Sequence, residues 1–326
     1  MAAGPSGNRE DIVLKYITAK GQRLSRFSLG TVQIGMTYGL GEHKAKPSEE
    51  AAFALLDQAM ALGVDNLDTA NNYGDAEEVI GRWMAKRRAE NKSLPWVVTK
   101  IGPMKHGSFD ILRDDILRQT EGCCKNLGVE TLDCLMLHNF SDYEQDADAI
   151  RKVFEEMKQQ NMYKYSAISA YSYNDYNMIA ESGFDATQIP MNVFDWGKIE
   201  DGGIETIAKS GMMMFIRSVF LQGLVFQKPE KLDPRMDFCV PYLQKYLDLC
   251  KEFEVSPAVL ALSFVLSVPG VTTAVLGCDT PEQAAQNCDL FDQTIALSNE
   301  QMDKLHEAFH GIDPRVINPG CWYNHT

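Results

Sequence analysis

The sequence predicts an α/β protein built as one (β/α)8 barrel, a closed ring of eight parallel strands that are each followed by a helix. Short apolar runs alternate along the chain with amphipathic segments, and this alternation requires a parallel sheet. About eight such units follow one another, at roughly 30 to 40 residues each, which suits a barrel. No G-x-G-x-x-G sequence opens a predicted helix, so a Rossmann-type sheet is disfavoured.

The expected elements follow in order along the chain. Residues 12–21 alternate loosely and end at Gly21, so a hairpin is expected before the first barrel strand. Ser48 is a predicted N-cap, because two acids and an i, i+3, i+4 apolar pattern follow it. The barrel strands are expected at 24–31, 65–68, 96–100, 132–138, 163–169, 186–190, 212–216 and 272–276. The helices are expected at 48–62, 75–88, 110–127, 146–161, 173–182, 200–210, 240–253, 257–266, 281–291 and 299–309.

Composition and charge exclude several classes of function. The 326 residues carry a net charge of −14, which disfavours nucleic acid and anionic membrane as partners. No apolar run approaches 18 residues, so no transmembrane helix is predicted. Residues 1–11 are small and polar and are expected to form a disordered tail, and residues 12–326 a single domain.

The eight cysteines are scattered without a C-x-x-C pair. Their spacing does not suit a metal site, and a chain of this size does not need disulfides to fold. We therefore expect reduced thiols and a cytoplasmic location, and we expect no metal.

The candidate site lies where the predicted strands end. Barrel enzymes carry their chemistry at the carboxyl ends of the strands. Asp68, Lys100 and His138 end three successive strands, 32 and 38 residues apart, and Tyr73 follows Asp68 in the same loop. Taken singly, an aspartate here can cap a helix, a lysine can reach the surface, and a histidine can be structural. Together, at one rim, they indicate a catalytic site.

These four side chains suit proton transfer by a tyrosine. A phenol with a pKa of about 10 is a weak acid at neutral pH. A lysine ammonium beside Tyr73 would favour the phenolate, and Asp68 would hold that ammonium in place. His138 could orient a substrate oxygen toward the phenol. A carbonyl polarised in this way invites hydride addition, and the hydride must come from a cofactor.

The residues from about 12 to 310 resemble the aldo-keto reductases, in particular their bacterial-type branch. The stretch Asp68-Thr69-Ala70-x-x-Tyr73-Gly74-x-x-Glu77-x-x-Ile80-Gly81 is similar to the family signature, and Lys100 and His138 match its other two catalytic positions. The resemblance implies a (β/α)8 barrel, NAD(H) or NADP(H) as cofactor, and Asp68, Tyr73, Lys100 and His138 as the catalytic residues. It also implies a small carbonyl or alcohol substrate.

The resemblance also implies where a cofactor would bind. Ala170 replaces an asparagine that usually accompanies the serine at 169, and Arg217 stands where many members stack a tyrosine. The expected cofactor-binding residues are Gly30, Thr31, Asp68, Ser169, Gln188, Arg217, Ser218, Phe220, Leu221, Gly223, Gly277, Gln283, Gln286 and Asn287.

Two of these positions concern the choice of cofactor. Members that prefer NADP often have a lysine and an arginine where this chain has Gly277 and Gln283. The change removes two charge-assisted hydrogen bonds to a 2′-phosphate, each worth roughly 1.5–3 kcal/mol. We therefore hypothesise that NAD(H) is used well or preferred.

The substrate-binding residues are expected to be Tyr38, Tyr73, His138 and Trp196, and the tail around Trp322 could form a lid. Aromatic and polar side chains together favour a sugar-like carbonyl compound. Two alternatives stay open: a cofactor-binding regulatory subunit of a membrane channel with little turnover, and a metal-dependent barrel hydrolase that uses Asp68 and His138. The hydrolase lacks the expected H-x-H pair or carboxylate cluster. The sequence has no heptad repeat and indicates no oligomer interface, so the oligomeric state is left as unknown.

Overall fold

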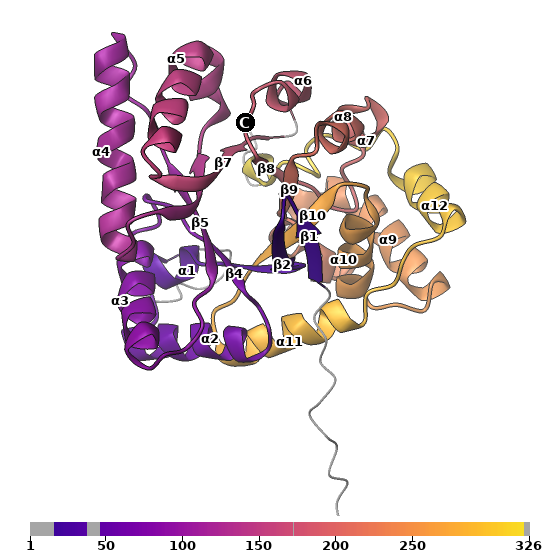
Figure 1. Cartoon of the computed structure of the whole chain (residues 1–326). Helices are drawn as coiled ribbons and strands as arrows, with labels where there is room; N and C mark the ends of the chain where they lie inside the picture. The colour runs from indigo at the N-terminus through magenta and orange to yellow at the C-terminus, as the bar shows by residue number, and fades with distance from the viewer. Residues whose placement is uncertain (1–15, 38–45, 172, 323–326) are drawn as a thin grey trace, which may run out of the picture.

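The computed structural model describes residues 16–37, 46–171 and 173–322. Eight parallel strands form a closed barrel in the order β10-β3-β4-β5-β6-β7-β8-β9, which confirms the predicted fold (Figure 1). The strands are β3 Phe27–Gly30, β4 Asn66–Asp68, β5 Trp96–Ile101, β6 Leu132–Leu137, β7 Tyr163–Ser169, β8 Ala186–Pro190, β9 Met213–Arg217 and β10 Val271–Gly277.

The helices surround this barrel in Figure 1. The Ser48 hydroxyl accepts a hydrogen bond from the Ala51 N–H, which confirms the predicted N-cap, and Gly128 ends α4 with a φ of 63°. The helices are α1 Val32–Gly35, α2 Glu49–Ala61, α3 Ala76–Ala89, α4 Phe109–Leu127, α5 Phe140–Gln159, α6 Tyr176–Ala180, α7 Gly197–Glu200, α8 Gly203–Ser210, α9 Val240–Glu252, α10 Pro257–Ser267, α11 Pro281–Asp292 and α12 Asn299–Phe309.

The predicted helices 173–182 and 200–210 are shorter in the structure, where they are α6 and α8, and the largest difference is at the start of α5. Helix α5 begins at Phe140 and contains a kink at Asp146, whose φ is −134°. The sequence prediction started this helix only at residue 146 and was wrong about the first turns. Those turns are tied to the preceding loop by side chains that a helical periodicity does not reveal.

A hairpin precedes the barrel, as expected, but it extends to Ser25, so the first barrel strand begins at Phe27 and not at the predicted residue 24. Strands β1 Tyr16–Ala19 and β2 Gln22–Ser25 pair in antiparallel register. Leu24 of β2 belongs to the same buried cluster as Trp96 and Phe215, which come from barrel strands. The hairpin therefore covers the amino-terminal end of the barrel interior, and the opposite end remains for the candidate site.

The alternation of side chains along the strands places the candidate residues inside the barrel. Val98, Met136, Ala167, Ala186 and Phe215 all lie in the interior cluster. Side chains two residues apart on a strand point to the same face. Their partners at i+2 therefore also point inward, at the carboxyl end: these are Lys100, His138, Ser169, Gln188 and Arg217.

All eight cysteines are free thiols, as the sequence predicted. Among the described residues, no helix combines the length and the apolar character needed to cross a membrane. The proposed tail at residues 1–11 lies outside the described residues.

Candidate active site

A buried ion pair forms the base of the candidate site. Lys100 is fully buried, and its Nζ donates to Oδ2 of Asp68 at 2.7 Å and to the backbone carbonyl of Thr69 at 3.0 Å. Burial lowers the pKa of the Lys100 ammonium, but the charges of Asp68 and Tyr73 outweigh this effect and raise the pKa above its ordinary value. Lys100 is therefore a permanent cation in the site.

Tyr73 lies next to this cation. Nζ of Lys100 is 3.5 Å from the Tyr73 hydroxyl oxygen and 5.0 Å from the centre of the phenol ring. A positive charge at this distance favours the ionised form of a phenol. Asp68, Tyr73 and Lys100 are thus brought together as the sequence predicted.

His138 completes the group from the next strand. Its ring meets the ring of Tyr73 edge-on, with the ring centres 5.9 Å apart. Burial, together with the charges of Lys100 and Arg217, lowers the pKa of His138 to about 3. The imidazole is therefore neutral at physiological pH. Its Nδ1 is buried and has no hydrogen-bond partner among the described residues.

The loop that carries Tyr73 is held by two glycines. A Cβ atom on Gly35 would lie 1.8 Å from the carbonyl oxygen of Tyr73, and one on Gly74 would lie 2.2 Å from the carbonyl oxygen of Gly35. Gly74 also has a φ of 58°, which side chains disfavour. The close approach of these two backbones fixes the position of Tyr73 against α1.

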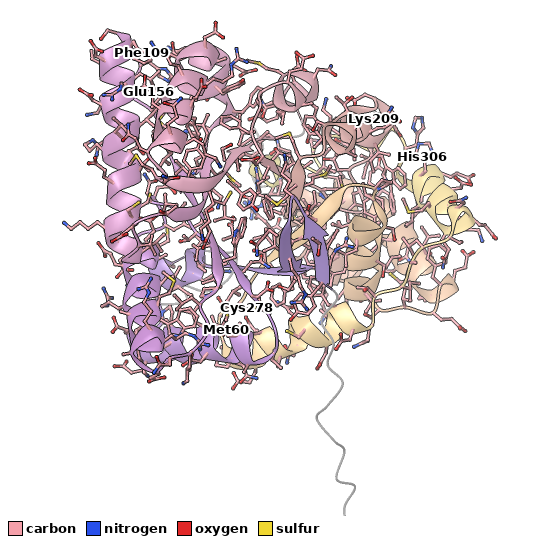
Figure 2. The ribbon with its side chains drawn as sticks, in the orientation of Figure 1. Met60, Phe109, Glu156, Lys209, Cys278 and His306 are labelled. Atoms are coloured by element: carbon pink, nitrogen blue, oxygen red, sulfur yellow. The ribbon has the colours of Figure 1, made fainter. Side chains whose placement is uncertain are left out.

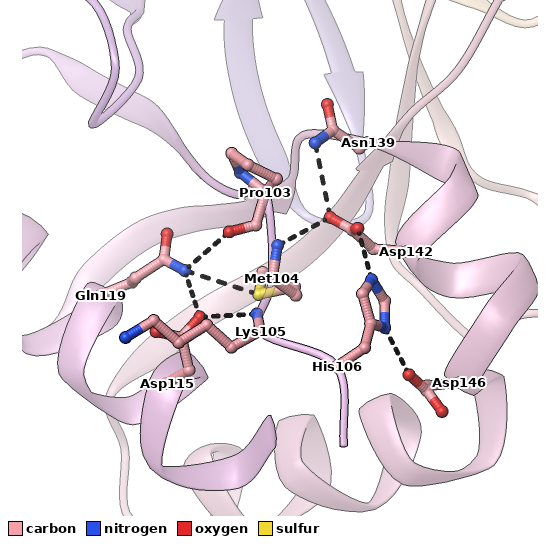
Figure 3. A network of polar contacts seen from close by, with 9 residues as sticks. All are labelled: Pro103, Met104, Lys105, His106, Asp115, Gln119, Asn139, Asp142 and Asp146. Atoms are coloured by element: carbon pink, nitrogen blue, oxygen red, sulfur yellow. Dashed lines mark hydrogen bonds and ion pairs between the residues drawn. The ribbon is translucent and has the colours of Figure 1, made fainter. Parts of the chain in front are cut away.

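Gln119 on α4 connects the loops after β4 and β5. Its Oε1 accepts hydrogen bonds from the Asn71 side chain at 2.8 Å and from the Gly102 N–H at 2.9 Å. Its Nε2 donates to Asp115 at 2.8 Å (Figure 3). Gln119 is not predicted from the sequence, because nothing in its local pattern distinguishes it from a surface glutamine.

A second set of contacts attaches the loop after β5 to the start of α5. Figure 3 shows His106 between two carboxylates, with Nε2 3.0 Å from Asp142 and Nδ1 2.5 Å from Asp146. Asp142 also accepts from the Met104 N–H at 3.1 Å and from the Asn139 side chain at 3.4 Å. Asn139 follows His138 directly, so this network borders His138.

The first predicted cofactor-binding positions lie around Asp68. The N–H and the hydroxyl of Thr31 both donate to the Asp68 carbonyl, and Gly30 pairs with Asp68 across the strands. The Gln188 amide donates to Oδ1 of Asp68 at 2.6 Å, so both carboxylate oxygens of Asp68 have a partner. Ser169 is buried on the neighbouring strand, in register with Gln188.

Arg217 lies on the same rim at the end of β9. Its Nη2 donates to the Ala170 carbonyl at 3.2 Å, and its guanidinium lies 4.5 Å from the ring centre of Tyr171. The backbone that follows is unusual: the φ angles of Ser218, Leu221, Gln222 and Gly223 are 63°, 45°, 50° and 89°. In turns of this kind, successive backbone N–H groups can face one concave surface, and such surfaces can bind anions. Phe220, in the same loop, packs on Phe226.

The region after β10 contains amides in place of cations. A Cβ atom on Gly277 would lie 2.3 Å from Nε2 of Gln33, and Oε1 of Gln33 is buried without a partner among the described residues. Oε1 of Gln283 accepts from the Asp279 N–H at 2.7 Å, and Asn287 donates to the Cys278 sulfur at 3.2 Å. Gln286 is exposed on α11. An orphaned amide oxygen and uncharged amides suit the hydroxyl and base groups of a nucleotide.

Two predicted substrate residues lie outside the tetrad of Asp68, Tyr73, Lys100 and His138, namely Tyr38 and Trp196. Tyr38 lies outside the described residues. Trp196 is buried against Phe264 and His306, with ring centres 5.1 and 5.0 Å away, and its indole N–H donates to the Val193 carbonyl. Trp196 therefore packs between α10 and α12, which favours a structural role over contact with substrate. Trp322 is likewise buried, and its indole donates to two backbone carbonyls.

A closed barrel with an Asp-Tyr-Lys-His group at its carboxyl rim defines a class of barrel enzymes. The model of the Aldo/keto reductase family matches residues 27–309, and the chain belongs to this family.

The chain also resembles individual members over most of its length. It is 24% identical over 339 residues to the uncharacterized oxidoreductase YrpG of Bacillus subtilis, covering 94% of this chain and 99% of the relative. It is 24% identical to an L-glyceraldehyde 3-phosphate reductase of Escherichia coli O157:H7, with 90% and 91% covered. The fold matches that of aldo-keto reductase AKR11C1 from Bacillus halodurans with a TM-score of 0.71 and 19% identity, covering 91% and 96% of the two chains.

Proposed function

We propose that this protein is an oxidoreductase that interconverts a carbonyl compound and an alcohol with NAD(H) or NADP(H), and that Tyr73 is its general acid and base. The observation that carries the proposal is the position of the Tyr73 hydroxyl, 3.5 Å from a buried ammonium that is itself paired with Asp68. Family membership supports the reaction class.

The chain's own residues account for the proton transfer. In reduction, the Tyr73 hydroxyl donates its proton to the substrate oxygen, and Lys100 stabilises the phenolate that remains. In the reverse direction, the phenolate accepts the proton of the alcohol. His138, neutral because its pKa is about 3, can donate a hydrogen bond to the same oxygen without adding a second positive charge. A bound nicotinamide cofactor would supply or accept the hydride.

The residues proposed to hold the cofactor form an arc along the rim. Ser169, Gln188 and Arg217 come from three neighbouring strands. The loop that follows Arg217 offers backbone N–H groups for a pyrophosphate, and its residues are Ser218, Phe220, Leu221 and Gly223.

The two ends of the cofactor would meet different residues. The amides of Gln283, Gln286 and Asn287 would face the adenosine part. Gly30, Thr31 and Asp68 would line the nicotinamide side.

We propose NAD(H) as the better cofactor, because the Gly277 and Gln283 positions carry no cation. The amide of Gln33 also occupies the space that a side chain at position 277 would need. The test is a comparison of kcat/KM for NADH and NADPH. A lower value for NADPH is expected, and a strong NADPH preference would overturn this part of the proposal.

For the substrate, we propose a small sugar-like aldehyde or ketone. The similarity to a reductase named for L-glyceraldehyde 3-phosphate supports this class. The experiment is NADH and NADPH oxidation against a panel of short aldehydes, hydroxyketones and keto-sugars, run with a parallel measurement of cofactor binding. Turnover of any compound in the panel would support the proposed oxidoreductase activity. Tight cofactor binding without turnover across the whole panel would instead favour a regulatory subunit.

A further inference from the structure

Outside the candidate active site, three metal-ligating side chains meet on the surface between α7 and α12. They are Glu200, His306 and His310, and one ligand atom from each lies within 4.8 Å of the other two. Oε1 of Glu200 is 2.9 Å from Nε2 of His306 and 2.8 Å from Nδ1 of His310. Among the described residues, no other group of three or more His, Cys, Asp or Glu side chains has its ligand atoms this close together.

The two histidines lie close together at the carboxyl end of α12. His306 lies in the last turn of α12, and His310, four residues later, is the C-cap residue that follows the helix. Their ring centres are 5.2 Å apart. The indole of Trp196 packs against His306 with ring centres 5.0 Å apart and restricts the orientation of that imidazole.

The donor set has a clear chemical preference. Two imidazoles and one carboxylate suit Zn²⁺ and the neighbouring divalent metals better than Mg²⁺ or Ca²⁺, which prefer oxygen ligands. With metal–ligand bonds of about 2.0–2.2 Å, ligand atoms around a tetrahedral ion lie roughly 3.3 Å apart. The observed separations of 2.8 and 2.9 Å require only a small opening of the cluster.

The surroundings leave the site accessible. The side chains of His306 and His310 are 44% and 66% exposed, so an ion can enter from solvent and keep water as a further ligand. Figure 2 labels His306 at the outer edge of the molecule, on α12. The net charge of −14 also favours the approach of cations.

We propose that Glu200, His306 and His310 form a binding site for one divalent transition-metal ion of the Zn²⁺ type, which joins α12 to α7. The ion links the carboxyl end of α12 to the segment that follows β8. This site is separate from the tetrad, and its metal has no part in the proposed carbonyl chemistry.

The test is titration of the full chain with ZnCl₂ by isothermal calorimetry. We expect one site in the wild type, and at least a tenfold loss of affinity in each of Glu200→Gln, His306→Gln and His310→Gln. Glu307→Gln is the matched control, because this exposed carboxylate lies on the same helix outside the cluster, and it should bind as the wild type does. Since the three variants change exposed or half-exposed side chains, circular dichroism should show unchanged folding.

A second readout uses the contact between Trp196 and His306. Cu²⁺ bound beside an indole quenches its fluorescence, so Cu²⁺ should quench the wild type, and Trp196→Phe should remove most of that quenching while retaining the Zn²⁺ binding heat. Zn²⁺ affinity that is the same in the wild type and all three ligand variants would overturn the proposal. The cluster would then be a hydrogen-bonded contact only.

Discussion

The Lys100 ammonium lies 2.7 Å from the Asp68 carboxylate, and both side chains are buried at the carboxyl end of the barrel. Breaking such a pair from one side leaves a buried charge without its partner, which costs about 3–5 kcal/mol. Lys100→Met should therefore reduce both turnover and the free energy of unfolding measured in urea.

The matching double variant tests the pairing itself. In Lys100→Met with Asp68→Asn, neither side chain is left as an unpaired charge, so the double variant should be more stable than the sum of the two single losses predicts. Strictly additive losses would show that the two groups do not interact in solution.

The approach of Gly35 to Tyr73 makes a second prediction. Gly35→Ala places a Cβ atom within 1.8 Å of the Tyr73 carbonyl oxygen, so the loop must move. A displacement of about 1 Å at a reacting group can cost a hundredfold in rate, and we expect kcat to fall by at least tenfold.

Gly122→Ala is the matched control for this change. Gly122 lies inside α4, and an added Cβ would meet nothing within 4 Å. Alanine there should leave kcat unchanged and raise stability by roughly 0.5–1 kcal/mol. Equal effects of the two substitutions on kcat would contradict the role assigned to Gly35.

The low pKa of His138 makes a prediction about pH. Burial, with the charges of Lys100 and Arg217, lowers that pKa to about 3. Below pH 6.5 the unfolded chain binds a proton at this residue while the folded chain does not, so stability should decrease as the pH falls from 6.5 toward 3. An NMR titration of the ring protons should show no ionisation of His138 between pH 5 and 8. A titration near pH 6.5 would contradict the geometry of the site.

His106 should behave in the opposite way. Its hydrogen bond to Asp146, opposed by burial and assisted by Asp142, raises its pKa above 6.5. The stabilising contact is complete below pH 6.5 and is lost as the pH rises through the folded-state pKa. Hydrogen exchange corrected for intrinsic rates should therefore show less protection of residues 104–107 at pH 9 than at pH 6. His106→Gln should remove this difference, and pH-independent protection in the wild type would show that the charge of His106 does not hold this loop.

Strand periodicity predicted most of what positions the site. The polar residues at the carboxyl ends of the strands were identified from the sequence. Asp68, Tyr73, Lys100 and His138 meet there as expected. The alternation of side-chain direction predicts nothing about residues outside a strand. Trp196 lies six residues after the end of β8, outside any strand, and it packs among helices instead of at the rim.

The supporting contacts could not be predicted for a related reason. Gln119 reaches Asn71 and Gly102 across 48 and 17 residues, and such pairings depend on how α4 packs on the barrel. Glu200 and His306 are 106 residues apart, and no local pattern connects them.

The proposed proton transfer by Tyr73 can be measured as the single-turnover rate of carbonyl reduction by Tyr73→Phe, with cofactor binding measured on the same samples. We expect the rate to fall by about 10²–10⁴-fold with cofactor affinity retained. A Tyr73→Phe variant that reduces the carbonyl at the wild-type rate would show that Tyr73 is not the proton donor.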